Sequence, residues 1–190
     1  MRILHYTLGF PPHRSGGLVR YAIDLMQAQR DLGHDVVALY PGNFSFVSDI
    51  CNFKKMKSYD GITMFQLNNA LPISLMYGIR NPADFIAPRR IEGIDAFMNN
   101  VNPDIFHIHT LMGLPKELII MIKQHGIKIV YTSHDYFGLC PRVNFINYKG
   151  LVCKEMNEIN CKQCGMHSHG SFFLKIRNSE LLIPLKKILR

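Results

Sequence analysis

The amino-acid sequence predicts an α/β fold built on a doubly wound, mostly parallel, Rossmann-like sheet. Apolar runs of strand length alternate with helical patterns along the 190-residue chain, which is the order that βαβ units produce. Several runs are continuously apolar, as in strands that are buried on both faces of a parallel sheet. A chain of this length has room for one domain with a sizeable core.

The first third of the chain contains three predicted strands and one long helix. The first strand covers residues 2–8, and the next two cover residues 35–40 and 61–67. Between the first two strands, apolar residues recur at helical spacing from Ser15 or Gly16 until Gly33 ends the helix. The polar and aromatic stretch 42–60 matches neither pattern.

Proline marks the helix starts in the second part of the chain. Asn81-Pro82 and Pro88 suit helix starts, because proline at the first helical position loses a hydrogen bond that is unmade anyway. The helix after Pro88 has a buried stripe of Ile91, Ile94, Phe97, Met98 and Val101. A strand, a helix and a buried strand follow at residues 105–109, 115–126 and 127–132, and a cysteine-bearing loop comes next.

Three loops are expected to meet at one edge of this sheet. Ligands of doubly wound sheets bind beyond the carboxyl ends of the strands, and the segments 9–17, 109–113 and 133–142 fall there. In the first loop, Gly16 and Gly17 let the backbone approach a ligand at a helix N-terminus, where phosphate is the natural guest. The dinucleotide and Walker fingerprints are absent, and a simple chain turn at the glycines stays open.

Histidines end the two later strands. Alternation puts His107 and His109 on one side of their strand, where they could bind a metal, although no third ligand is evident nearby, or serve as structural hydrogen-bonders. His109 lies nearer the cleft. His134 and Asp135 could orient or protonate a substrate oxygen, while the alternative is a histidine that caps the following turn.

Four clustered cysteines suggest a metal site. They are Cys140, Cys153, Cys161 and Cys164. The pair Cys161–Cys164 has the spacing of one zinc knuckle, and clustered cysteines in a cytosolic protein favour a metal over disulfides. We therefore expect a structural zinc, with four free thiols as the alternative. Cys51 stands apart and reads as a small buried hydrophobe.

The charge pattern bears on partners and location. The formal net charge is +8, and the segment 171–190 is basic and amphipathic, which suits either an anionic membrane surface or packing on another domain. No apolar run reaches the roughly 18 residues of a membrane-spanning helix, and the N-terminus reads as a strand, not a signal peptide. A cytoplasmic protein, at most peripheral to the inner membrane face, is expected. Nucleic-acid motifs are absent.

Taken in order, several motifs resemble glycosyltransferase family 4. They are Phe10-Pro11-Pro12, Gly16-Gly17, Leu32-Gly33-His34-Asp35-Val36, the run from Pro103-Asp104 to His109, and the run from Ile129 through His134-Asp135-Tyr136 to Cys140-Pro141-Arg142. The resemblance spans roughly residues 1–165, and the His-Asp-Tyr to Cys-Pro-Arg stretch is its most specific part.

The resemblance implies one half of a GT-B enzyme, in which two Rossmann-like domains face each other across a cleft. The N-terminal domain holds most of the acceptor site, the C-terminal domain binds the nucleotide-sugar donor, and transfer generally retains anomeric configuration without a catalytic divalent metal or other cofactor. By position, Gly16 and Gly17 would meet the donor phosphates, and His134 and His109 would be the catalytic candidates. Asp135, Tyr136 and Arg142 are further cleft candidates.

The family's paired glutamates, separated by seven residues, do not occur in this sequence. We therefore expect residues 1–170 to form the N-terminal, acceptor-side domain, inactive without its missing donor-binding domain. The acceptor would be a glycan or lipid-linked glycan of cell-surface polysaccharide synthesis. An apolar stretch with arginines at 69–90 could lean on a membrane or simply cover the core. The rival function is a metal-stabilised four-cysteine binding or regulatory module.

Overall fold

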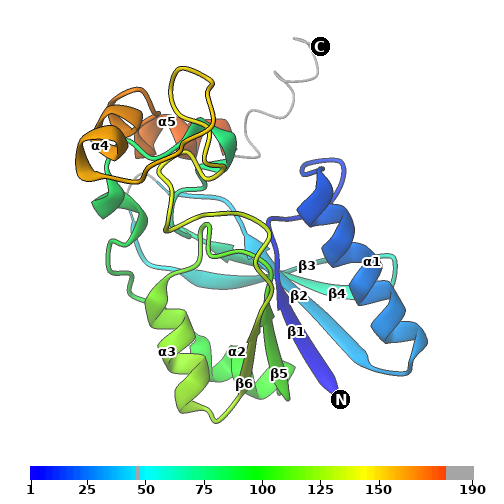
Figure 1. Cartoon of the computed structure of the whole chain (residues 1–190). Helices are drawn as coiled ribbons and strands as arrows, with labels where there is room; N and C mark the ends of the chain where they lie inside the picture. The colour runs from blue at the N-terminus through cyan, green and yellow to red at the C-terminus, as the bar shows by residue number, and fades with distance from the viewer. Residues whose placement is uncertain (46–47, 179–190) are drawn as a thin grey trace.

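The computed structural model describes residues 1–45 and 48–178 and contains a six-stranded sheet in the order β3-β4-β2-β1-β5-β6 (Figure 1). The strands are β1 (Arg2–Tyr6), β2 (Asp35–Pro41), β3 (Asn52–Tyr59), β4 (Ile62–Asn68), β5 (Ile105–Ile108) and β6 (Lys128–Tyr131). Neighbouring strands are parallel except for the antiparallel pair β3–β4. The predicted Rossmann-like α/β fold is confirmed.

Helices cover both faces of the sheet. Helix α1 (Gly17–Asp31) packs on one face, and α2 (Ile94–Val101) and α3 (Lys116–Gln124) lie on the other (Figure 1). Two 3-10 helices, η1 (Leu75–Tyr77) and η2 (Pro82–Phe85), follow β4. The cysteine-bearing segment, α4 (Glu158–Met166) and α5 (Ser171–Asn178) gather beyond the carboxyl ends of the strands (Figure 1).

The alternation of side chains along β1 separates two cores. Leu4 and Tyr6 are buried in the core that includes α2 and α3. His5 lies between them in sequence and contacts α1, on the opposite face, through a hydrogen bond to Gln29. A strand whose successive side chains point to opposite faces explains this division. The continuous apolar run of β1 therefore serves both faces, with one buried polar side chain on the α1 face.

Two predicted elements differ from the structure. The unassigned stretch 42–60 contains β3, an edge strand whose exposed lysines, such as Lys54 and Lys55, suit a strand edge that must not pair further. The helix expected from Pro88 begins only at Ile94, and Ile91 instead forms an isolated bridge with Cys51. The prediction was wrong because Ile91 belongs to the sheet-edge pairing and not to the helical stripe.

Most of the apolar side chains in the segment 69–90 are part of the core. Leu71, Ile73 and Ile79 are buried, and Arg89 pairs with Asp49 at 3.6 Å. Of the two structures that the sequence allowed here, the core-covering segment is the one observed for these residues. The start at Asn81-Pro82 is present as η2, where the Asn81 side chain accepts a hydrogen bond from the Ala83 N–H.

The basic C-terminal segment falls only partly within the described residues. Its first part is α5, whose Leu174 is buried against Ile79 and Phe85, while residues 179–190 lie outside the described residues. Within residues 1–45 and 48–178, no helix has the length and apolar character needed to cross a membrane. The division of the chain at residue 170 stays a prediction.

Candidate functional site

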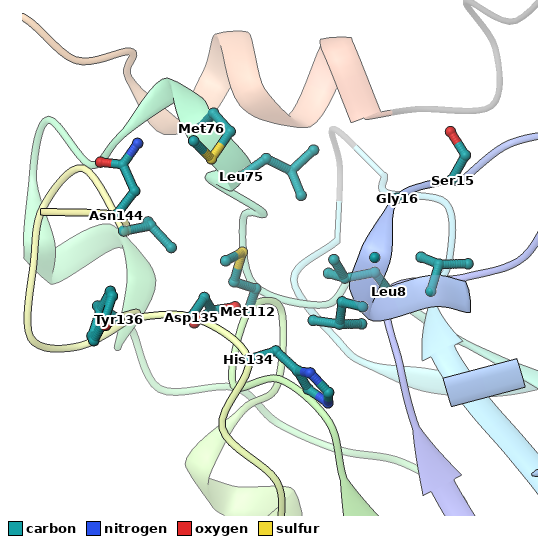
Figure 2. A pocket seen from close by; sticks show the side chains of 14 residues that line it. Leu8, Ser15, Gly16, Leu75, Met76, Met112, His134, Asp135, Tyr136 and Asn144 are labelled. Carbon is teal, nitrogen blue, oxygen red and sulfur yellow. The ribbon is translucent and has the colours of Figure 1, made fainter. Parts of the chain in front are cut away.

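A cavity of about 370 Å³ opens at the carboxyl edge of the sheet, where the three predicted loops meet (Figure 2). The loop after β1 contributes Gly16 and Gly17, the loop after β5 contributes Met112, and the loop after β6 contributes His134, Asp135 and Tyr136. Leu75 and Met76 from η1 line the side of the cavity that lies toward α5 (Figure 2). Because β1 lies between β2 and β5, this is the switch point at which doubly wound sheets bind ligands.

The start of α1 offers unshielded backbone N–H groups to this cavity. Gly16 is the N-cap residue with φ 125°, a conformation that a residue with a Cβ adopts at a steric cost, and no acidic side chain lies in the first turn. A Cβ placed on Gly16 or Gly17 would meet no atom within 4 Å, so the space in front of the helix start is open. A helix N-terminus of this kind favours an anion.

His134 faces the same cavity with a neutral ring. Burial lowers the pKa of His134 from its ordinary value, and the charge of Asp135 opposes this shift. The ring lies 4.7 Å from the Tyr21 ring, centroid to centroid. The Asp135 carboxylate accepts a hydrogen bond from the Phe137 N–H at 2.9 Å, which fixes the turn that carries His134. An uncharged imidazole at neutral pH is the result.

The structure brings together five of the seven predicted cleft residues. They are Gly16, Gly17, His134, Asp135 and Tyr136. His109 and Arg142 are not among the lining residues: His109 is fully buried, with its ring 5.7 Å from that of His134, and Arg142 is half-buried. The chemical roles assigned to all seven residues stay predictions.

His5 joins His107 and His109 in a buried cluster. One ring nitrogen of each residue lies within 4.8 Å of those of the other two, a spacing that could hold a metal ion. His5 is the cross-strand partner of His107 in the β1–β5 register, and it is the third candidate ligand, which the sequence alone did not indicate. The sequence shows that side chains alternate along each strand, but it does not show that β1 and β5 are neighbours. That pairing is what places His5 beside His107. Burial and then neighbouring imidazoles lower the pKa of His5 to about 4 and that of His109 to about 3.

A model of glycosyltransferase family 4 matches residues 15–149. The chain belongs to glycosyltransferase family 4. No curated protein matches this family 4 chain. The matched range contains the α1 start and His134 but ends before Cys153, Cys161 and Cys164, so the match says nothing about these three cysteines.

Four of the five cysteines of this family 4 chain line one small cavity of about 20 Å³. Cys161 and Cys164 stand one turn apart on α4, and Cys140 and Cys153 reach the cavity from the preceding loop. All are free thiols. Burial and then the nearby Cys153, Cys140 and Cys164 raise the pKa of Cys161. The other three thiols are therefore close enough to Cys161 to influence its ionisation.

Proposed function

We propose that this family 4 chain forms the acceptor-side half of a retaining glycosyltransferase that moves a sugar from a nucleotide-sugar donor to a glycan or lipid-linked acceptor. The observation that carries the proposal is the single cavity in which the start of α1 and His134 meet. A second, donor-binding domain would close over this cavity from outside.

The physical chemistry of sugar transfer suits these two features. Breaking a sugar–pyrophosphate bond develops negative charge on the leaving phosphate and positive charge on the sugar ring. Fixed N–H donors at Gly16 and Gly17 would stabilise the phosphate without a protein nucleophile. The neutral ring of His134 could lie against the developing positive charge without repelling it, as a lysine would. The donor-binding domain would supply the cations that this cavity lacks among its lining residues.

An acceptor that is a membrane-linked or cell-surface glycan fits the side of the cavity formed by η1. Met76 lines the cavity and is 60% exposed, and Ile86, from the same connection, is 67% exposed. The net charge of +8 adds attraction to lipid-linked phosphate. These features support the acceptor class and leave its identity open.

The substitution Gly17→Asp tests the phosphate site. An aspartate at the first position of α1 should favour the helix dipole by roughly 0.3–1 kcal/mol while repelling a diphosphate. We therefore expect binding of UDP-glucose, GDP-mannose or another nucleotide sugar of a panel, followed by saturation-transfer NMR, to weaken at least about tenfold, corresponding to about 1.4 kcal/mol. The thermal midpoint should stay unchanged or rise.

Gly170→Asp provides the matched control for this experiment. Gly170 also precedes a helix and lies outside the cavity, and a Cβ added there would meet no atom within 4 Å. The control should bind the panel like the unsubstituted chain. Equal binding by Gly17→Asp and Gly170→Asp, or no response of the unsubstituted chain to any donor, would exclude the phosphate site at α1.

We also propose that the four cysteines bind a structural zinc. The cysteine cavity lies next to the donor cavity, because the loop that leaves Tyr136 reaches Cys140 within one turn through the Cys140 N–H to Tyr136 carbonyl bond of 2.9 Å. Zinc would replace the contact of 3.2 Å in which the Cys153 thiol donates to the Glu155 carbonyl. Tetrahedral thiolate sites of this type stabilise the folded loop. Such a zinc would brace the cavity wall and take no part in the chemistry.

Metal content measured on the purified chain tests this second proposal. We expect equimolar zinc, and a cobalt-substituted sample should show thiolate-to-cobalt charge-transfer absorption. Cys161→Ser should lose both signals, while Cys51→Ser, a buried thiol elsewhere in the fold, should keep them. Unchanged metal content in Cys161→Ser would contradict the proposal. Metal without any donor response would favour the four-cysteine module as the rival function.

A further inference from the structure

A chain of hydrogen bonds runs from α1 through the histidine cluster toward the cavity. The Gln29 side-chain oxygen lies 2.7 Å from His5 Nε2, and His5 Nδ1 lies 2.9 Å from His109 Nε2. His5 and His109 are fully buried. Their rings are stacked with centroids 5.2 Å apart. This chain links a helix on one side of the sheet to the ring beneath His134.

The chemistry of these atoms fixes where the protons are. With its side-chain oxygen toward His5, Gln29 accepts a hydrogen bond from His5 Nε2–H, and a neutral His5 then has a bare Nδ1. That bare nitrogen accepts from the Nε2–H of His109. A neutral His109 is consequently bare at Nδ1. Each ring is held in the Nε2–H tautomer by the partner before it.

The chain ends at two buried nitrogens that lack partners. His109 Nδ1 and His134 Nε2 are both buried without a hydrogen-bond partner among residues 1–45 and 48–178, and their rings are 5.7 Å apart, centroid to centroid. Buried polar atoms are nearly always paired, often through ordered water. A proton on His134 Nε2, shared with His109 Nδ1 through one water or a small closing movement, satisfies both atoms.

We propose that Gln29, His5 and His109 are positioning residues that hold His134 as its Nε2–H tautomer and leave its bare Nδ1 for the cavity. The proposal rests on the function proposed above, in which His134 lies beside the transferred sugar. His134 then accepts a hydrogen bond from a sugar hydroxyl and does not donate one. The transferred sugar must therefore offer an O–H or N–H group at that position, which restricts the sugar class.

A hydrogen-bond chain accounts for this cluster better than a metal ion does. His5 Nδ1 and His109 Nε2 lie 2.9 Å apart and already satisfy each other as a hydrogen-bonded pair. The three candidate ligands are neutral imidazoles with no carboxylate among them, so a divalent cation would bury uncompensated charge. Burial also lowers the pKa of His5 and His109 far below neutrality, which agrees with uncharged, hydrogen-bonded rings.

Imidazole ¹⁵N NMR of the full chain tests the proposal without any substrate. Protonated and bare ring nitrogens have well-separated shifts, so we expect the Nε2–H pattern for His5, His109 and His134 at neutral pH. Gln29→Met keeps the side-chain length but removes the acceptor, and should cause loss of the single-tautomer pattern at His109 and His134. Gln29→Glu keeps an acceptor at the same position and should restore it. His125, at the end of α3, should be unchanged in both variants.

Three results would overturn the proposal. The first is an Nδ1–H tautomer for His109 or His134 in the unsubstituted chain. The second is an unchanged His134 pattern in Gln29→Met, and the third is joint displacement of the His5, His107 and His109 signals by equimolar zinc chloride, which would make the cluster a metal site. None of these results depends on nucleotide-sugar binding, so the positioning chain and the proposed transferase function can fail separately.

Discussion

At the scale of single residues, the histidine cluster is unusual because it places three titratable rings inside the core. His5, His107 and His109 line the α1 face of two central strands, where an aliphatic residue would be the default. Hydrogen bonds pair most of the ring nitrogens that the cluster buries, as for His107 Nε2 at 2.8 Å from the Thr132 hydroxyl, and His109 Nδ1 is the exception. Protonation would break this arrangement, since each ring has only one donor position that the cluster can use.

Stability should therefore fall steeply in mild acid. Burial holds the pKa of His5 at about 4 and that of His109 at about 3, whereas the unfolded chain titrates near 6.5. Between these values the unfolded state binds more protons, so the stabilisation present above about pH 6.5 is lost as the pH falls toward 4 and then 3. We expect a loss on the order of 3 kcal/mol from each of the two rings by about pH 4, measured by urea unfolding across pH.

His5→Leu provides the comparison for this pH dependence. The variant should have a shallower slope of unfolding free energy against pH between about pH 6.5 and 4, whatever its stability at neutral pH. The slope is proportional to the difference in bound protons between the unfolded and folded states, and the variant has one titrating ring fewer. His34→Gln, near the start of β2, should keep the full slope. Identical slopes for the unsubstituted chain and His5→Leu would contradict the assignment of the acid sensitivity to the cluster.

At the scale of elements, the sequence allowed prediction wherever a local signal was sufficient. The repeat of apolar residues and the closing Gly33 placed α1, and Pro115 placed the start of α3 within one residue. Strand β3 was missed because an edge strand with one exposed face has no continuous apolar run. The predicted start of helix α2 was too early, because Ile91 is buried through its bridge to Cys51 and does not belong to the helix.

The candidate site was also predictable only where the signal was local in the sequence. Its three loops could be predicted, because carboxyl ends of parallel strands must lie at one edge of a sheet. The link from His5 to His109 could not, since it depends on which strands are neighbours and on how α1 brings Gln29 over β1. The full burial of His109 could not be predicted for the same reason, because a residue at the end of a strand can face either the cleft or the layer beneath it.

At the scale of the whole molecule, the cavity lies where two parts of the structure meet. The sheet and α1 form one side, and the cysteine-bearing segment with α4 and α5 lies over the connection that carries η1 (Figure 1). Hydrogen bonds join this connection to the segment above it: the Ile79 N–H donates to the Pro141 carbonyl at 2.7 Å, Arg80 Nε donates to the Ser168 carbonyl at 2.9 Å, and the His169 N–H donates to the Tyr77 carbonyl at 3.3 Å. The position of η1 in the cavity wall depends on this junction.

Gly78 is the tightest point of the junction, and a methyl group there should separate the two parts. A Cβ at Gly78 would collide with the Ser168 side chain and lie 3.0 Å from the Pro141 carbonyl oxygen, whereas Gly93 has a similarly positive φ, near 74°, and open space around it. Gly78, with ψ −177°, lies in a backbone region that is nearly restricted to glycine, whereas Gly93, with ψ 16°, lies in the left-handed helical region. The difference between the two Gly→Ala variants therefore combines backbone strain with the steric collision. We expect Gly78→Ala to lower the unfolding free energy by about 1–3 kcal/mol more than Gly93→Ala. Hydrogen exchange should increase at residues 140–168 and stay slow in β1, and equal exchange in the two variants would show that the junction does not hold the cavity wall.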